Sequence, residues 1–156
     1  MSLIELDHID RLILNALQNN SRISNVELAR MVGLSPSPCL RRVKALEESG
    51  AIQRYVTLLD QGAVGFPVSV FVNVTLERQV ETALEQFEAA IKKRPEVDEC
   101  YLMTGAADYL LRVVTSDLAS YERFLVDHLT RIPRVSSIKS SFSLKQVSYR
   151  TALPLE

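Results

Sequence analysis

Three basic side chains without an acidic neighbour mark one short segment of the chain. The stretch from Ser35 to Leu46 contains Arg41, Arg42 and Lys44 and no aspartate or glutamate. Arginine can hold a phosphate or a guanine edge through two hydrogen bonds, and serine hydroxyls can donate to phosphates or bases. The segment is therefore a candidate contact with double-stranded DNA, and the expected contact residues are Ser35, Ser37, Arg41, Arg42 and Lys44.

The same side chains have plainer interpretations. Three cations on one helix can form an ordinary solvated face, and Arg42 can be a half-buried structural residue that braces the preceding helix. Arg54 lies just beyond the segment and is expected to contact the DNA backbone only if the surrounding elements form a DNA-reading unit. The choice depends on the elements that position these side chains.

The first third of the chain has the pattern of three helices. A helix from about Asp7 to residue 18 is predicted by apolar residues at helical spacing, namely Ile9, Leu12, Ile13, Ala16 and Leu17. Ser24 and Glu27 have the spacing of a capping box that opens a second, short helix. Ser35-Pro36 starts a third helix that runs to about residue 49. The second and third helices are joined by a short turn and follow the first helix. This arrangement is typical of a helix-turn-helix.

In the rest of the chain, strand patterns alternate with helical ones. Residues 52–59 are expected to form a strand or short β-wing, and residues 61–67 a linker rich in glycine and proline. The patterns beyond predict the order βαββαβ, with strands at 68–76, 97–104, 108–115 and 135–147 and helices at 80–93 and 118–130. This order is the ferredoxin-like arrangement, so the expected fold class is α+β, with domains at 1–60 and 68–156.

The predicted sheet has two faces, but its helices can cover only one of them. The other face needs a partner, and another subunit is the usual solution. A homo-oligomer is therefore expected.

The connection between the second and third predicted strands is the candidate ligand contact in this half. Gly105 lets the backbone approach another group closely, and Asp108 can accept hydrogen bonds from the α-ammonium group of an amino acid. Thr104 is a further candidate of the same kind. The plainer alternative is a tight β-turn in which Asp108 bonds backbone of its own loop.

Composition and spacing exclude several function classes. His8 and His128 have no second ligand at metal spacing, Cys39 and Cys100 lie far apart, and no nucleophile-elbow or phosphate-cradling pattern is present. We therefore expect no enzyme, no metal and no cofactor. The chain shows neither a signal peptide nor a membrane span, which predicts a cytoplasmic protein. Its formal net charge of −1 means that any attraction to DNA must come from locally concentrated charge.

Two segments are similar to a known family. Leu34–Ile52 (LSPSPCLRRVKALEESGAI) resembles the recognition-helix segment of the Lrp/AsnC (feast/famine) transcriptional regulators, and Gly105–Leu111 (GAADYLL) resembles the G-x-x-D-Y-L-L segment of their sensory domain. The resemblance implies a winged helix-turn-helix joined to a RAM/AsnC-type sensory domain, with dimers that often form octamers. It also implies an amino acid or related metabolite bound between subunits, and control of genes for amino-acid metabolism or transport.

The resemblance adds residues to the expected effector site and leaves two rival functions open. Ser140 and Ser141 align with the other side of the family's effector pocket, and apolar neighbours such as Leu102 and Met103 favour branched or apolar amino acids. One departure is Arg134, which stands where the family often has glycine in a Pro-Gly-Val turn. The rivals are an architectural DNA-binding protein without an effector and a small-molecule enzyme on the ferredoxin-like domain.

Overall fold

The computed structural model describes residues 4–155, and the chain divides into two compact units. The first contains the chain up to Leu58 together with the segment from Val147 on, and the second is Leu59–Gln146. The expected second domain, 68–156, thus differs from the structure at its end, because the last residues group with the first unit. No helix among the described residues is long and apolar enough to cross a membrane.

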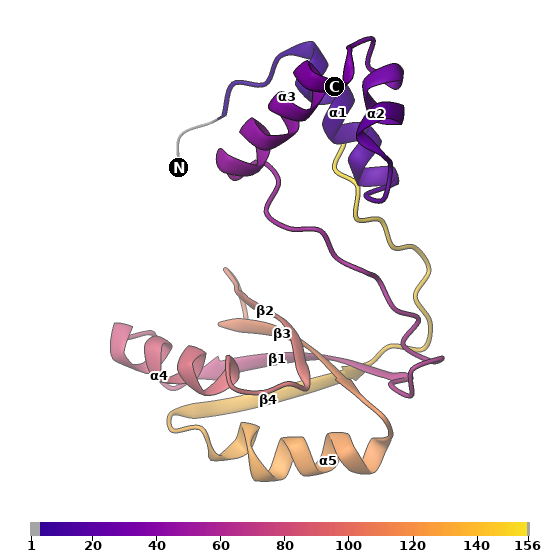
Figure 1. Ribbon diagram of the computed structural model, residues 1–156. Helices are drawn as coiled ribbons and strands as arrows, with labels where there is room; N and C mark the ends of the chain where they lie inside the picture. Colours follow the sequence, from indigo (N-terminus) through magenta and orange to yellow (C-terminus); the bar gives the residue numbers. More distant parts are fainter. Residues whose placement is uncertain (1–3, 156) are drawn as a thin grey trace. The chain divides into compact units, whose positions relative to one another are not determined.

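The first unit is a bundle of three helices, α1 (His8–Asn19), α2 (Asn25–Met31) and α3 (Pro36–Glu48) (Figure 1). Asp7 and Asp10 form a reciprocal capping box at the start of α1, and the Ser24 hydroxyl accepts from the Glu27 backbone N–H at the start of α2. The turn into α3 passes through Gly33, whose φ of 72° suits glycine. The core contains Ile13, Leu14, Leu28, Ala29, Val32, Cys39 and Leu46.

The structure has no strand at 52–59, since these residues contain neither helix nor strand. A strand needs a neighbour for its backbone hydrogen bonds, and no strand of the described first unit supplies one. The segment nevertheless exposes large apolar side chains, namely Tyr55, Val56, Leu58 and Leu59.

The second unit has the expected order βαββαβ. It comprises β1 (Val68–Leu76), α4 (Glu81–Ile91), β2 (Val97–Leu102), β3 (Tyr109–Thr115), α5 (Leu118–Asp127), the short 3₁₀ turn η1 (Leu129–Arg131) and β4 (Val135–Phe142). The sheet is antiparallel with the order β2-β3-β1-β4, which confirms the ferredoxin-like prediction. β4 ends five residues before the predicted 147. Its antiparallel partner β1 begins at Val68 and offers no residues to pair with the last predicted residues of β4. The last backbone hydrogen bond between them is donated by Ser143 to the carbonyl of Ser69.

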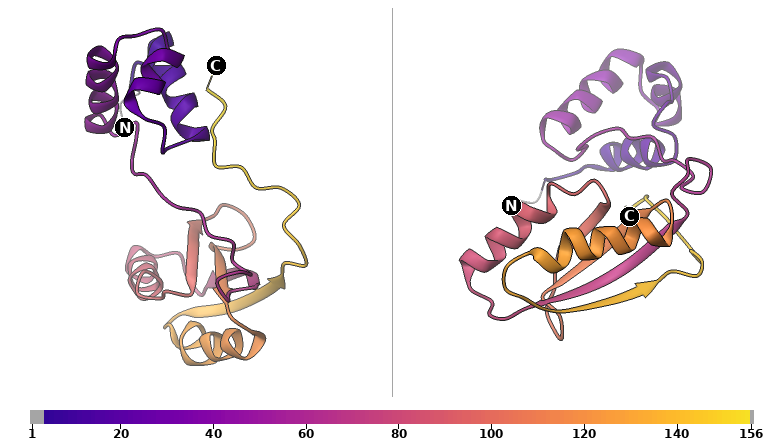
Figure 2. Two further views of the ribbon diagram at one scale, coloured as in Figure 1. Left: turned by 45° about the vertical axis from the view of Figure 1, so that its right-hand side comes forward. Right: turned by 90° about the horizontal axis from the view of Figure 1, so that it is seen from below.

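The two faces of the sheet differ in character. Val70, Val72 and Val74 of β1 are fully buried and pack with Phe87 of α4 and Phe124 of α5 in one core, so both helices cover this face (Figure 2). The residues between them on β1 point to the opposite face, which is mainly polar and also exposes aromatic rings. Register places on that face Phe71, Asn73 and Thr75 of β1, Leu110 and Arg112 of β3, and Ser137, Lys139 and Ser141 of β4.

Arg134, in the turn before β4, adopts a φ of 66°. This left-handed conformation is costly for a residue with a side chain and is free for glycine. The arginine that replaces the family's usual glycine has therefore kept the glycine-like turn, and its carbonyl accepts a hydrogen bond from Glu77 at 2.8 Å.

Candidate functional site

One face of α3 presents the predicted DNA contacts to solvent. Ser35, Ser37, Arg41 and Lys44 are all exposed, and neither cation forms an ion pair with any residue between 4 and 155. Ser35 is the N-cap of α3, yet its hydroxyl makes no capping bond. The side chains at the start of this helix are therefore available for contacts outside the chain.

Arg42 is placed differently. Its guanidinium bonds the Asp7 carboxylate at 2.6 Å and the Asp10 carboxylate at 2.8 Å, and its side chain is 35% exposed. The backbone N–H of Asp10, with help from Arg42, holds the pKa of Asp7 below its usual range. This geometry favours the structural interpretation of Arg42, with the difference that it braces α1 rather than the preceding helix α2.

Asn25 is a positioning residue that the sequence pattern did not single out. Its side-chain amide donates to the carbonyl of Pro36 at 2.8 Å and so links the first residue of α2 to the first residue of α3. An asparagine after the Ser24 cap gives no sequence signal for this role, because its partner is a backbone carbonyl eleven residues away. This bond connects the starts of the two helices across the turn.

Arg54 is exposed in the segment after α3, and its neighbour Tyr55 is bonded to that helix. The Tyr55 hydroxyl donates to Glu47 at 2.9 Å, and burial together with this bond raises the pKa of Tyr55 to about 12. The bond keeps the start of the segment close to the end of α3, so Arg54 remains near the exposed helix.

The second unit contains a cavity of about 490 Å³ on the polar face of its sheet. The β2–β3 connection forms one wall, and strands β1 and β4 form the floor. The lining residues are Asn73, Thr75, Met103, Thr104, Ala106, Ala107, Ser137 and Lys139. Lys139 is the charged group among them, and it forms no ion pair within the described residues.

Only some of the predicted effector residues lie at this cavity. Thr104 lines it, and Gly105 stands in the same connection with a φ of 119°. The Asp108 carboxylate is buried and accepts from the Leu76 backbone N–H at 2.6 Å and from the Gln79 amide, so it anchors the cavity wall to the end of β1. This is close to the plainer interpretation, except that Asp108 bonds Leu76 at the end of β1 and Gln79 just beyond it, and not the backbone of its own loop.

Ser140 and Ser141 lie outside the cavity lining. Ser140 is on the helix side of β4, where its hydroxyl bonds that of Tyr121. Ser141 is exposed on the polar face opposite Phe71. The polar lining residues that were not predicted are Asn73, Thr75, Ser137 and Lys139. Asn73 and Thr75 alternate with apolar residues on β1, which was a sign of their direction, whereas the polar run around Lys139 on β4 gave none.

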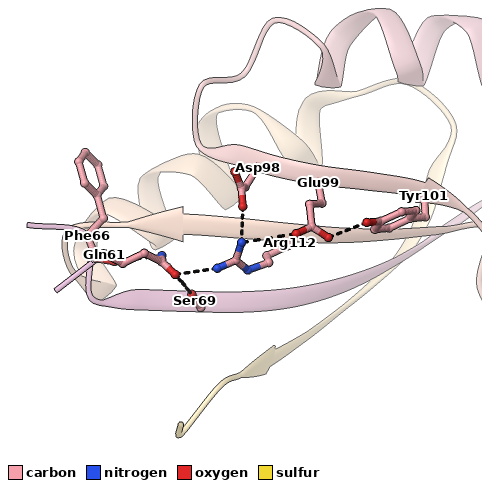
Figure 3. A network of polar contacts seen from close by, with 7 residues as sticks. All are labelled: Gln61, Phe66, Ser69, Asp98, Glu99, Tyr101 and Arg112. Atoms are coloured by element: carbon pink, nitrogen blue, oxygen red, sulfur yellow. Dashed lines mark hydrogen bonds and ion pairs between the residues drawn. The ribbon is translucent and has the colours of Figure 1, made fainter. Parts of the chain in front are cut away.

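A network around Arg112 occupies another part of the polar face (Figure 3). The side chain of Arg112 is 17% exposed, contacts Asp98 and Glu99 of β2, and donates to Gln61 at 2.6 Å. Gln61 in turn bonds Ser69, so the network ties the expected linker to the sheet. The polar face therefore has a fixed pattern of charge with exposed aromatic rings beside it.

Comparison with known proteins gives the same division of roles. Residues 6–53 match the family model of a winged helix-turn-helix DNA-binding domain, and residues 69–153 match that of the Lrp/AsnC ligand binding domain. The Bkd operon transcriptional regulator of Pseudomonas aeruginosa is 51% identical over 151 residues, which is 97% of this chain and 99% of that protein. The leucine-responsive regulatory protein of Salmonella typhimurium is 43% identical, over 97% of this chain and 93% of that protein.

Solved structures of transcriptional regulators are also similar to this chain. The complex of a transcriptional regulator from Neisseria meningitidis with L-Met is 42% identical, with a TM-score of 0.92 and coverage of 97% of both chains. Escherichia coli AsnC is 25% identical, with a TM-score of 0.86 over 97% of this chain and all of that one. The exposed basic face of α3, the ferredoxin-like second unit and these matches together show that the chain belongs to the Lrp/AsnC family of DNA-binding transcriptional regulators.

Proposed function

We propose that α3 enters the major groove of duplex DNA, with Ser35, Ser37, Arg41 and Lys44 as contacts and Arg54 on the flanking backbone. The observation that carries this proposal is the pair of exposed cations, Arg41 and Lys44, without ion-pair partners within residues 4–155. The major groove is wide enough for an α-helix, and residues near the helix start reach base edges. A DNA-binding regulator with this site acts in the cytoplasm.

The test is a fluorescence anisotropy titration at several salt concentrations, with the DNA upstream of the protein's own gene as the ligand. Arg41→Ala should weaken binding and make the log–log salt slope shallower by about one unit, because one fewer counterion is released. Lys92→Ala is the control, since Lys92 pairs with Glu88 on the second unit and should leave both quantities unchanged. An unchanged affinity for Arg41→Ala would contradict the proposal.

For the sensory unit we propose an amino-acid effector in the cavity lined by Thr104 and Lys139. Lys139 supplies a cation for the α-carboxylate, while the hydroxyls of Thr75 and Thr104 and the Asn73 amide supply hydrogen-bonding groups. Asp108 and Gly105 shape the wall. The structure from Neisseria meningitidis binds L-Met, which supports an amino acid as the ligand class. Met103 adds an apolar side chain that favours an apolar effector.

A thermal-shift screen of the twenty amino acids tests this assignment. We expect at least one apolar amino acid to raise the melting temperature and to change DNA affinity, and Lys139→Met to abolish the shift. Lys145→Met, outside the cavity, is the control. No shift with any amino acid would instead favour the architectural DNA-binding protein, and turnover of a ligand would favour the enzyme.

We also propose that the chain assembles into at least two subunits. The polar face of the sheet exposes the rings of Phe71 and Tyr101, and residues 55–59 expose apolar side chains on an unpaired backbone. A second copy can cover both. Two DNA-reading units held by one dimer imply half-sites about one helical turn, or a multiple of it, apart. An effector then acts if it binds one arrangement of the subunits more tightly than another.

A further inference from the structure

The end of the described chain lies against helix α1 of the first unit (Figure 1, yellow). The Gln18 carboxamide oxygen accepts from the Leu153 backbone N–H at 2.6 Å, and its NH₂ group donates to the Leu153 carbonyl at 3.1 Å. The Asn15 side chain donates to the Leu155 carbonyl at 3.2 Å, and Gln18 also donates to Asn15 at 3.4 Å. Two side-chain amides one helical turn apart thus bind an extended backbone as a neighbouring strand would.

Apolar packing adds to these polar contacts. Leu155 packs against the core of the three helices, whereas Leu153 is 69% exposed. Pro154 separates them, and a residue before proline is confined largely to extended backbone. The segment is therefore recognised through its backbone and one apolar anchor, with its extended form already favoured before it docks.

We propose that the α1 surface formed by Asn15 and Gln18 is a docking site for the chain's own segment Leu153–Leu155, and that Ser143–Leu155 thereby acts as a strap. The chain leaves the first unit after Leu58 and returns to it at Val147, so the docked strap adds a second connection to the linker. Two connections restrict the orientations open to the DNA-binding unit more than one does. Because the segment is tethered, its effective concentration at α1 is high.

The occupancy of the strap can be measured without DNA or effector. Arg150 lies three residues before Leu153, and a protease must hold several extended residues on each side of the bond it cuts, so trypsin should cut after Arg150 faster once Leu153 has left α1. When detachment is fast and reversible, the cleavage rate follows the detached population. Gln18→Ala removes two bonds to Leu153 and Leu155→Ala removes the anchor, so each should speed cleavage after Arg150 by roughly two- to tenfold.

Asn19→Ala is the matched control. Asn19 is the next residue on α1, but its side chain bonds only the Asn15 carbonyl within the helix. Its cleavage rate should equal that of the unmodified chain, and hydrogen exchange at the Leu153 amide should quicken in Gln18→Ala but not in Asn19→Ala. Circular dichroism of each variant shows whether the three helices stay folded. Equal cleavage and equal exchange in Gln18→Ala and Asn19→Ala would overturn the docking site.

A second measurement tests the restriction itself. Inserting half a helical turn, about 5 bp, between the half-sites of the upstream region turns one half-site to the other side of the duplex. The unmodified chain should lose more affinity from this insertion than Gln18→Ala does. An equal loss would overturn the strap as an orienting device. A failure of DNA binding itself is distinguishable, because it would leave the cleavage and exchange results untouched.

Discussion

Two adjacent arginines on α3 have separate roles in this structure. Arg41 is exposed, whereas Arg42 is bonded to Asp7 and Asp10 of α1. Arg42→Ala should lower the melting temperature by no more than a few degrees, because the ion pairs are partly exposed and screened by salt. It should leave the salt slope of DNA binding unchanged, in contrast to Arg41→Ala. Thermal melts together with salt titrations of both variants check this, and a shallower slope for Arg42→Ala would make it a phosphate contact.

Asp7 is expected to make part of the protein's stability depend on pH in acid. Its pKa lies below the ordinary value of 3.8 because the Asp10 N–H and the Arg42 guanidinium stabilise the carboxylate. A carboxyl with a depressed folded-state pKa contributes stability above its unfolded pKa and loses it as the pH falls through the folded value. Asp7→Asn should therefore flatten the fall in melting temperature below about pH 4. Melting curves from pH 6 to pH 2.5 measure this, and an unchanged slope would remove Asp7 as the cause.

At the level of elements, the turn before β4 contains avoidable backbone strain. Arg134 holds a φ of 66°, which costs an L-residue about 1 kcal/mol. Glycine would avoid this cost, but it loses more conformational entropy on folding, which offsets part of the stabilisation. Arg134→Gly should stabilise the second unit by about 0.5 kcal/mol. Urea unfolding measures the difference, with Arg134→Ala as the control that removes the side chain and keeps the strain. Equal midpoints for the two variants would contradict this account.

The elements also show where sequence reasoning works and where it stops. Capping residues such as Asp7 and Ser24 act within one turn of chain, so the helix starts were predictable. The ends of the strands were less predictable, because they depend on a partner strand. β4 ends near the residue that pairs with the start of β1, and residues 52–59 have no strand to pair with in a single chain. The site divides in the same way. The exposed face of α3 follows from helical spacing, whereas the cavity joins two strands, β1 and β4, and the β2–β3 connection, which only the register of the sheet brings together.

At the level of the whole molecule, the polar face of the sheet is the surface through which we expect two copies to associate. Phe71 lies on this face with 39% of its surface exposed, and its register partner on β3 is Arg112. If two copies pack through this face, a lysine at position 71 is desolvated and lies beside that guanidinium. Burying an unpaired charge costs several kcal/mol, so Phe71→Lys should raise the dimer dissociation constant by at least about tenfold.

Sedimentation equilibrium over a range of concentrations measures that dissociation constant. Val126→Lys is the matched control, because Val126 is 52% exposed on α5, the element that packs on the opposite side of the sheet. It tests whether any new lysine on an exposed apolar site disrupts assembly. If both variants associate as the unmodified chain does, the subunits do not meet through this face. The exposed apolar side chains of residues 55–59 would then be the remaining candidate contact between copies.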